Sequence, residues 1–311
     1  MKAVRIQNYG DIDTLNYEDV PMPEPGPTDV RVAVHAAAVN PVDWKIRAGY
    51  LAEMIPYQLP LTLGWDVSGV VEKLGTEVTH LSVGDRVYSR PDITRDGTYA
   101  EYAVVRASEL ALKPETLSHN EAAAVPLAGL TAWQGLFEHA QLKEGERVLI
   151  HAGAGGVGSF AIQFAKWAGA HVIATASAPN EALVRGLGAD EFVDYRSQQF
   201  EDVVAKVDVV LDTIGGDTQE RSIQLLKAGG RLVSMVSTPD EASLASVGAT
   251  GKIFMVQPSS DGLSRIADLV DAGTVRVLID SVFPLSEARD AHARSQTGRA
   301  QGKIVLEVVA G

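Results

Sequence analysis

The fold is decided by residues 147–158, Arg-Val-Leu-Ile-His-Ala-Gly-Ala-Gly-Gly-Val-Gly. Five residues with strand character run into a glycine cluster, and a helical pattern follows from Ser159 to Ala168. Gly153, Gly155 and Gly158 fit G-x-G-x-x-G between a strand and a helix, the context in which the motif indicates a dinucleotide-binding turn. Gly153 permits a tight turn, Gly155 lets a pyrophosphate come close to the backbone, and Gly158 lets the helix pack on the strand. Free N–H groups at the start of the helix then bind the negative charge of the pyrophosphate. The alternative is a strand-to-helix turn with no ligand.

Strands and helices alternate on both sides of this turn, beginning after the capping-box pattern Ser118-His119-Asn120-Glu121. Six strands that are mostly separated by helices predict a doubly wound parallel sheet, an α/β fold of the Rossmann type. The predicted strands are Arg147–His151, His171–Ala176, Glu191–Tyr195, Val207–Asp212, Arg231–Val236 and Lys252–Val256. The predicted helices are Val157–Ala168, Ala182–Gly186, Phe200–Ala205, Thr218–Lys227 and Gly262–Ala272.

The remaining residues indicate a second domain of short strands. Strand-like segments alternate with Pro and Gly turns through residues 1–118, which favours a barrel-like, partly open β domain. After Thr274 the predicted elements are a strand Val275–Ile279, a helix near Ser286–Arg294 and a strand Lys303–Val309. This is too little for an independent domain, so we expect the segment to complete the first one. The predicted domains are therefore 1–121 with 274–311, and 122–273.

The composition restricts the class of protein. The chain of 311 residues has a net charge of −13, which argues against nucleic acid and anionic membranes as main partners. It has no Cys, so disulfides, thiolate catalysis and Cys-based zinc sites are excluded. No apolar run is long enough to span a membrane, and the N-terminus has no apolar signal-peptide segment. We expect a soluble, cytoplasmic protein.

The end of the second predicted strand bears on the choice of cofactor. An acid at this point marks NAD, because it holds the ribose 2′-hydroxyl. Here the chain reads Thr175-Ala176-Ser177-Ala178-Pro179-Asn180, without an acid at the tip. Ser177 can hydrogen-bond a 2′-phosphate, and Tyr195 with Arg196 could close the same pocket. This favours NADPH over NADH, although Ser177 and Asn180 can also be plain loop residues.

Several further stretches identify a family by their order along the chain. They are residues 39–50, 63–71, Gly84–Val87, Gly97–Tyr102, Ala128–Trp133 and the glycine turn. With these stretches the chain resembles the medium-chain dehydrogenases/reductases over almost its whole length, most closely the zinc-independent quinone oxidoreductase (zeta-crystallin-like) branch. The resemblance implies a Rossmann domain and a GroES-like, partly open β-barrel catalytic domain.

The resemblance also implies that the zinc ligands are missing. Zinc alcohol dehydrogenases of the superfamily have a ligand Cys at the place of Asn40, and Gly-His-Glu at the place of Gly64-Trp65-Asp66. The structural zinc loop with its four Cys is absent too. Without a Lewis acid, the acceptor itself must be electron-poor. A quinone or an α,β-unsaturated carbonyl compound takes a hydride if a donor stabilises the developing oxyanion.

By resemblance, Asn40, Lys45 and Tyr50 are candidate catalytic residues and Lys303 is a candidate cofactor contact. Asn40 would lie at the nicotinamide, while Lys45 and Tyr50 could hold the substrate oxygen or give the proton. Each has a structural alternative: Asn40 as a helix cap, Lys45 as a surface charge, Tyr50 as loop packing and Lys303 as a strand-edge charge. The other predicted cofactor contacts are Thr131, Gly153, Ala154, Gly155, Gly156, Val157, Ser177, Tyr195, Ile214, Val236, Ser237 and Met255.

The sequence thus predicts an NADPH-dependent, zinc-independent reductase of quinones, alkenals or enones. An enoyl-thioester reductase is a second possibility, and a non-catalytic NADPH-binding protein of the crystallin kind is a third. The strand Lys252–Val256 would be an apolar edge of the sheet, so we expect a homodimer that pairs there.

Overall fold

The computed structural model describes residues 1–309 and divides the chain into two compact units. One unit contains Met1–Leu127 and Gln257–Gly311, and the other contains Ala128–Val256. The sequence predicts the borders at 121/122 and 273/274, so the difference concerns mainly the helix α9, Ser260–Asp271. This helix packs on strand β8, and the Tyr88 hydroxyl donates to the Leu263 carbonyl (2.6 Å), which ties it to the first unit.

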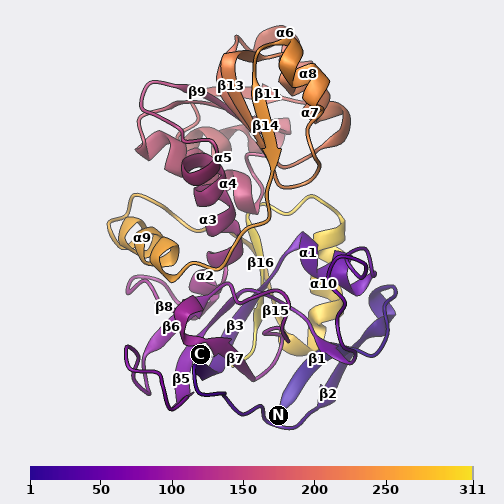
Figure 1. Ribbon diagram of the computed structural model, residues 1–311, viewed down its shortest axis with the longest axis vertical. Coiled ribbons are helices and arrows are strands. Elements are labelled where there is room, and N and C mark those ends of the chain that lie inside the picture. Colours follow the sequence, from indigo (N-terminus) through magenta and orange to yellow (C-terminus); the bar gives the residue numbers. More distant parts are fainter. Residues whose placement is uncertain (310–311) are drawn as a thin grey trace. The chain divides into compact units, whose positions relative to one another are not determined.

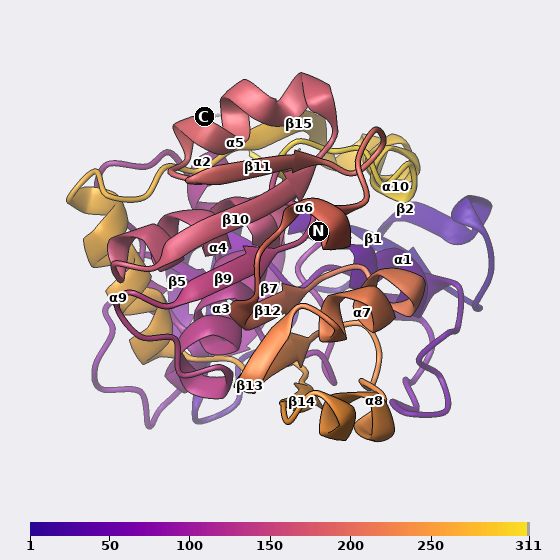
Figure 2. The same ribbon diagram turned by 90° about the horizontal axis from the view of Figure 1, so that it is seen from above.

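The second unit is built on a parallel sheet of six strands in the order β11-β10-β9-β12-β13-β14 (Figure 2). Its strands pair only in parallel, and the central ones are buried on both faces, as their Val, Leu and Ile residues require. The strands are β9 Arg147–Ile150, β10 His171–Ala176, β11 Glu191–Asp194, β12 Val207–Asp212, β13 Leu226–Ser234 and β14 Thr250–Ile253. The helices are α3 Pro126–Trp133, which begins in the first unit, α4 Gly156–Trp167, α5 Glu181–Gly186, α6 Phe200–Val203, α7 Gly216–Ile223 and α8 Glu241–Ser246, with a π-helix at Gln134–His139.

The first unit contains two sheets, one of three strands and one of seven. Three strands pair in the order β2-β1-β4, and a larger sheet runs β15-β16-β3-β5-β6-β8, with β7 paired to β3 (Figure 1). The long strand β3 is the centre of the larger sheet, and the C-terminal strand β16 pairs antiparallel with it. The strands are β1 Lys2–Ile6, β2 Leu15–Asp19, β3 Asp29–Val39, β4 Leu61–Thr62, β5 Val67–Leu74, β6 Arg86–Ser89, β7 Tyr102–Arg106, β8 Ala111–Leu112, β15 Ile279–Pro284 and β16 Lys303–Glu307. The remaining helices are α1 Pro41–Arg47, α2 His119–Ala123 and α10 Ala288–Gln296.

These elements confirm the predicted fold class, an α/β chain with a doubly wound parallel sheet and a second β domain. Two element predictions are wrong, and a third, the strand Lys252–Val256, is shifted, because β14 covers Thr250–Ile253. The helix predicted over Thr218–Lys227 ends at Ile223, and β13 already begins at Leu226. The strand predicted at Val275–Ile279 begins only at Ile279, where β15 can pair with β16.

Candidate functional site

The glycine turn between β9 and α4 has the geometry that the motif predicts. The Gly153 N–H donates to the Thr175 carbonyl (2.8 Å), which ties the turn to the neighbouring strand β10. A Cβ on Gly158 would stand 2.2 Å from the Ala152 carbonyl oxygen, so this position accepts only glycine. A Cβ on Gly155 would meet a single atom, the Ala152 oxygen at 3.3 Å, so the other side of Gly155 is open. Backbone N–H groups at the start of α4 are therefore accessible to a phosphate.

A buried carboxylate, Asp212, holds the turn that follows β12. It accepts hydrogen bonds from the backbone N–H groups of Ile214 and Gly215, both at 2.9 Å. The Gln219 amide and the Ser234 hydroxyl also donate to it, both at 2.8 Å. Four donors compensate for the complete burial of Asp212 and fix residues 213–215 at the carboxyl edge of the sheet. The sequence analysis missed this role, although an acid that ends an apolar strand is a usable signal.

The carboxyl ends of the parallel strands bring most predicted cofactor residues to one edge. Ser177 follows β10, Tyr195 follows β11, Ile214 follows β12, and Val236 with Ser237 follows β13. The side chains of Tyr195, Ile214, Val236 and Met255 are between 40% and 55% exposed, and so are accessible to a ligand. The Ser237 hydroxyl is buried without a partner, close to where a Cβ on Gly215 would stand (3.0 Å). Thr131 is buried in α3.

These residues fit a dinucleotide. The open glycine turn can take the pyrophosphate, and the orphaned Ser237 hydroxyl is a hydrogen-bonding group for which the described protein residues supply no partner. Near Ser177, the Asp194 carboxylate accepts from the backbone N–H groups of Ala178 and Arg196, both at 3.2 Å. The Arg196 guanidinium lies 5.8 Å from the centre of the Tyr195 ring. A cation therefore stands at the edge where a 2′-phosphate would bind.

In the first unit, Asn40, Asp66 and Lys303 form one buried polar cluster. The Lys303 ammonium donates to Asp66 Oδ2 (3.1 Å), to the Asn40 amide oxygen and to the Val39 carbonyl (3.3 Å). The Asn40 amide nitrogen donates to Asp66 Oδ2 (2.8 Å), and the Leu127 N–H donates to Asp66 Oδ1 (2.6 Å). The structure thus brings Asn40 and Lys303 together, with both polar ends of the Asn40 amide and the Lys303 ammonium engaged within the chain.

Asp43 lies next to this cluster. Its Oδ2 accepts from the Asn40 backbone N–H (2.8 Å) and from the Tyr99 hydroxyl (2.6 Å), while Oδ1 is buried without a partner. Burial raises the pKa of Asp43 to about 7, although both hydrogen bonds favour the charged form. Asp43 caps the start of α1 and is a carboxyl group that holds a proton below neutral pH.

Lys45 and Tyr50 do not join Asn40 in a cluster. Both contact Trp44: the Lys45 ammonium lies 5.8 Å from its ring centre, and the Tyr50 ring meets it edge-on at 6.1 Å. Tyr50 is 74% exposed and Asn40 only 2% exposed. The three predicted catalytic residues thus differ: Lys45 and Tyr50 are accessible at the end of α1, whereas Asn40 is a buried structural amide.

The donor set at Asn40, Trp65 and Asp66 does not fit a zinc ion. The indole of Trp65 donates to the Arg95 carbonyl (3.3 Å) and has no lone pair to offer a metal. Asp66 already carries the Lys303 ammonium as its counter-ion. Within residues 1–309, no three His, Cys, Asp or Glu side chains group as metal ligands would.

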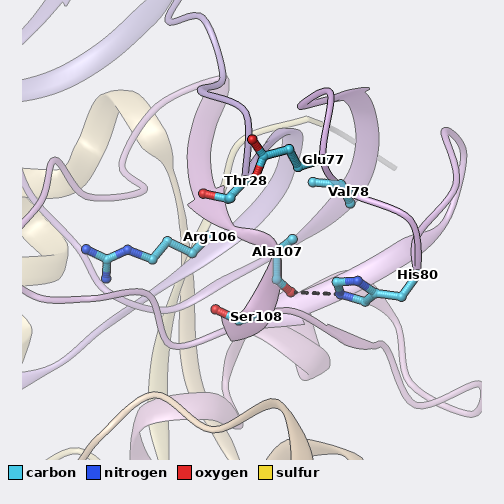
Figure 3. Close-up of a pocket in the computed structure, with 7 residues that line it drawn as sticks. All are labelled: Thr28, Glu77, Val78, His80, Arg106, Ala107 and Ser108. Atoms are coloured by element: carbon cyan, nitrogen blue, oxygen red, sulfur yellow. Dashed lines mark hydrogen bonds between the residues drawn. The ribbon is translucent and has the colours of Figure 1, made fainter.

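A cavity of about 380 Å³ lies elsewhere in the first unit (Figure 3). Two of its polar side chains are engaged in the structure: His80 Nε2 donates to the Ala107 carbonyl (3.2 Å), and Arg106 pairs with Asp92 (2.6 Å) and Glu109 (2.9 Å). It contains none of the predicted site residues. Its lining is Thr28, Glu77, Val78, His80, Arg106, Ala107 and Ser108.

Comparisons with known proteins agree with this geometry. Residues 26–115 match the family model described as "Alcohol dehydrogenase GroES-like domain", and residues 187–306 match "Zinc-binding dehydrogenase". The 2-methylene-furan-3-one reductase of Solanum lycopersicum is 38% identical, over 99% of this chain and 79% of its own. The chloroplastic NADPH-dependent alkenal/one oxidoreductase of Arabidopsis thaliana is 37% identical, over 98% and 79%.

Comparisons with solved structures indicate the same family. The quinone oxidoreductase of Coxiella burnetii superposes with a TM-score of 0.93 at 37% identity, and the match covers 99% of both chains. The Escherichia coli quinone oxidoreductase complexed with NADPH superposes with a TM-score of 0.90 at 28% identity, over 99% of this chain and 100% of its own. No helix among the described residues is long and apolar enough to cross a membrane. The chain belongs to the medium-chain dehydrogenase/reductase superfamily, in its quinone oxidoreductase branch, and is an oxidoreductase that binds an NADP-type cofactor.

Proposed function

We propose that this protein is an NADPH-dependent, zinc-independent reductase that transfers a hydride to a quinone or to an α,β-unsaturated carbonyl compound such as an enone or alkenal. The observation that carries the proposal is the Asn40–Asp66–Lys303 cluster. An ammonium neutralises the carboxylate at the place where metal-dependent relatives bind zinc. A substrate that needs no Lewis acid fits such a site, because conjugation already makes its carbon electrophilic.

The chain's own residues bind the cofactor and position the reactants. The glycine turn and the start of α4 would hold the pyrophosphate, and the strand ends with Ser177, Tyr195 and Ser237 would hold the ribose and its phosphate. NADPH supplies the hydride when bound. Lys45 and Tyr50 are accessible donors that can give a proton to the reduced substrate, directly or through water.

The proposal is tested with NADPH that carries deuterium at C4 and a panel of p-quinones, 2-alkenals and enones. We expect NADPH oxidation with at least one class, and deuterium on the β-carbon of a reduced enone. No turnover with any of them would contradict the proposal. Faster reduction of crotonyl-CoA than of crotonaldehyde would indicate an enoyl-thioester reductase, and tight NADPH binding without oxidation would indicate a crystallin-like binding protein.

The preference for NADPH over NADH rests on Ser177, Tyr195 and Arg196 at the ends of β10 and β11. Ser177→Asp places a carboxylate where the 2′-phosphate would bind, and repulsion should raise the KM for NADPH at least tenfold. The KM for NADH should change little. An equal effect on both cofactors would contradict the assignment of this edge to the 2′-phosphate.

We also propose that two copies associate through β14. This strand pairs with β13 on one side only, and its four residues are all exposed. Ile253 is 45% exposed and the nearby Met255 is 43% exposed. Such exposure of large apolar side chains is unusual at a sheet edge that faces water. Cytoplasmic location stays a prediction.

A further inference from the structure

Arg90 is a buried arginine without a partner in the first unit. The residue follows β6 directly and is 2% exposed. Its side chain makes no hydrogen bond or ion pair with any described residue, and its Nε is fully buried. The two terminal nitrogens, Nη1 and Nη2, also make no hydrogen bond, but they are not fully buried. They belong to the small exposed surface of Arg90. The guanidinium therefore has N–H groups that donate no hydrogen bond, at the end of a buried side chain.

The neighbouring carboxylates do not satisfy these donors. Asp66, Asp92 and Glu109 are the acids whose charge acts on Arg90, but none forms a salt bridge with it. Asp66 is paired with Lys303, while Asp92 and Glu109 are paired with Arg106. Burial lowers the pKa of Arg90, yet a guanidinium keeps its proton in proteins. A charge in this position is costly in the free protein and is compensated when an anion binds.

Its place in the sheet puts Arg90 beside the candidate site. In the antiparallel pairing of β5 with β6, Val67 stands opposite Ser89. Asp66 directly precedes β5 and Arg90 directly follows β6, and the charge of Asp66 acts on Arg90. Arg90 therefore lies next to the residue that joins Asn40 and Lys303. The aromatic rings of Tyr57 and Trp65, 6.2 Å apart, lie in the same region, and the charge of Arg90 acts on Tyr57.

We propose that Arg90 binds a carboxylate of the acceptor, so that the preferred substrate is an α,β-unsaturated carbonyl compound that also carries a carboxylate. The planar fork of a guanidinium matches two oxygens at once, as in a carboxylate, better than it matches one neutral carbonyl oxygen. The partly exposed ring of Tyr57 nearby suits the conjugated, apolar part of such a molecule. This inference rests on the proposed function and names its substrate class.

A matched pair of acceptors tests it: 7-oxooct-5-enoate and its methyl ester, in which three methylene groups separate the carboxyl group from the enone, so that the two differ in charge and not in conjugation. We expect the wild-type protein to reduce the acid with the higher kcat/KM. Arg90→Gln should lower kcat/KM for the acid by about tenfold to a hundredfold, mostly through KM, and change the ester little. Arg90→Lys should fall between the two. Arg86→Gln, at the exposed start of the same strand, is the control and should leave the ratio unchanged.

Thermal unfolding distinguishes binding from a structural role. Because Arg90 is unpaired in the free protein, Arg90→Met should unfold at the same or a higher temperature. The saturated product, 7-oxooctanoate, should raise the Tm of the wild type but not that of Arg90→Gln. A lower Tm for Arg90→Met, or equal losses on acid and ester, would overturn the inference. Reduction of the ester with no preference for the acid would overturn it as well, while leaving the proposed function intact; no turnover of either would contradict the function itself.

Discussion

The residue that distinguishes this site most is Lys303. Its ammonium is 4% exposed and serves as counter-ion to Asp66, which is fully buried. A buried carboxylate that loses its salt-bridge partner retains the desolvation cost without the compensation of that ion pair. The cluster should therefore contribute to folding as well as to the chemistry.

Lys303→Met should lower the free energy of unfolding by about 3–5 kcal/mol, because Asp66 is left unpaired. Lys73→Met is the control, since Lys73 forms an exposed pair with Glu24 (2.6 Å) and should cost less than about 1 kcal/mol. Urea unfolding of both variants measures the difference. If Lys303→Met/Asp66→Asn is no more stable than Lys303→Met, the loss does not come from an unpaired Asp66.

His151 makes stability depend on pH at the acidic side. Its Nε2 donates to the Ser222 hydroxyl (2.8 Å) and its Nδ1 accepts from the Thr175 hydroxyl (3.1 Å), an arrangement that requires the neutral ring. The Ser222 hydroxyl hydrogen goes to the Thr218 carbonyl (2.6 Å), which fixes these roles. Burial lowers the pKa of His151 from 6.5 to about 4.

Since the folded pKa is the lower one, the unfolded chain takes up the proton first as the pH falls. The contribution of His151 is complete above pH 6.5 and is lost as the pH falls from there through about 4. It amounts to roughly 3 kcal/mol. His151→Gln should make the fall of unfolding free energy over this range shallower. The same slope in wild type and variant would contradict this account.

Individual residue roles were only partly predictable from the sequence. The roles of Gly153, Gly155 and Gly158 could be assigned because the spacing G-x-G-x-x-G between a strand and a helix is typical of one backbone geometry. Asn40 was predicted as catalytic, whereas its amide is held by Asp66 and Lys303, residues far away in the sequence. The absence of any partner for Arg90 has no sequence signal, because partners are decided by packing between distant segments.

At the scale of elements, the turn from β9 into α4 has a strict steric requirement at Gly158. Gly158→Ala would force a Cβ to within 2.2 Å of the Ala152 carbonyl oxygen, so the turn must shift away from α4. We expect at least a tenfold loss of NADPH affinity, measured by fluorescence titration. Gly229→Asn, at a position of β13 with left-handed backbone and open space, is the control and should keep wild-type affinity. Unchanged binding by Gly158→Ala would contradict the role of the turn.

The boundaries of helices and strands are the part of the fold that the local sequence predicts least well. The six strands of the parallel sheet could be recognised because each is a short apolar run between turns. The segment Leu226–Gly230 looked like the end of a helix and the turn after it, yet it begins β13, because Leu226 pairs with Val207 of β12. Strand pairing of this kind is a tertiary effect, which helix propensity does not contain.

At the scale of the whole molecule, the proposed association through β14 can be tested by measuring the mass of the protein in solution. A lysine at position 253 would bring charge onto the exposed edge, so Ile253→Lys should convert a dimer into a monomer. Sedimentation velocity of both proteins measures this, with Val203→Lys, a change at an exposed residue of helix α6, as the control. A wild-type mass near 33.1 kDa would contradict the dimer.

The central claim is that the chain reduces a conjugated acceptor with NADPH and without a metal. The most direct measurement compares NADPH oxidation, with a p-quinone and with an enone, before and after removal of metals by a chelator. Metal content is followed by mass spectrometry in the same samples. We predict that the rates stay the same when zinc falls far below one atom per chain. Loss of activity on chelation, restored by added zinc, would contradict the account.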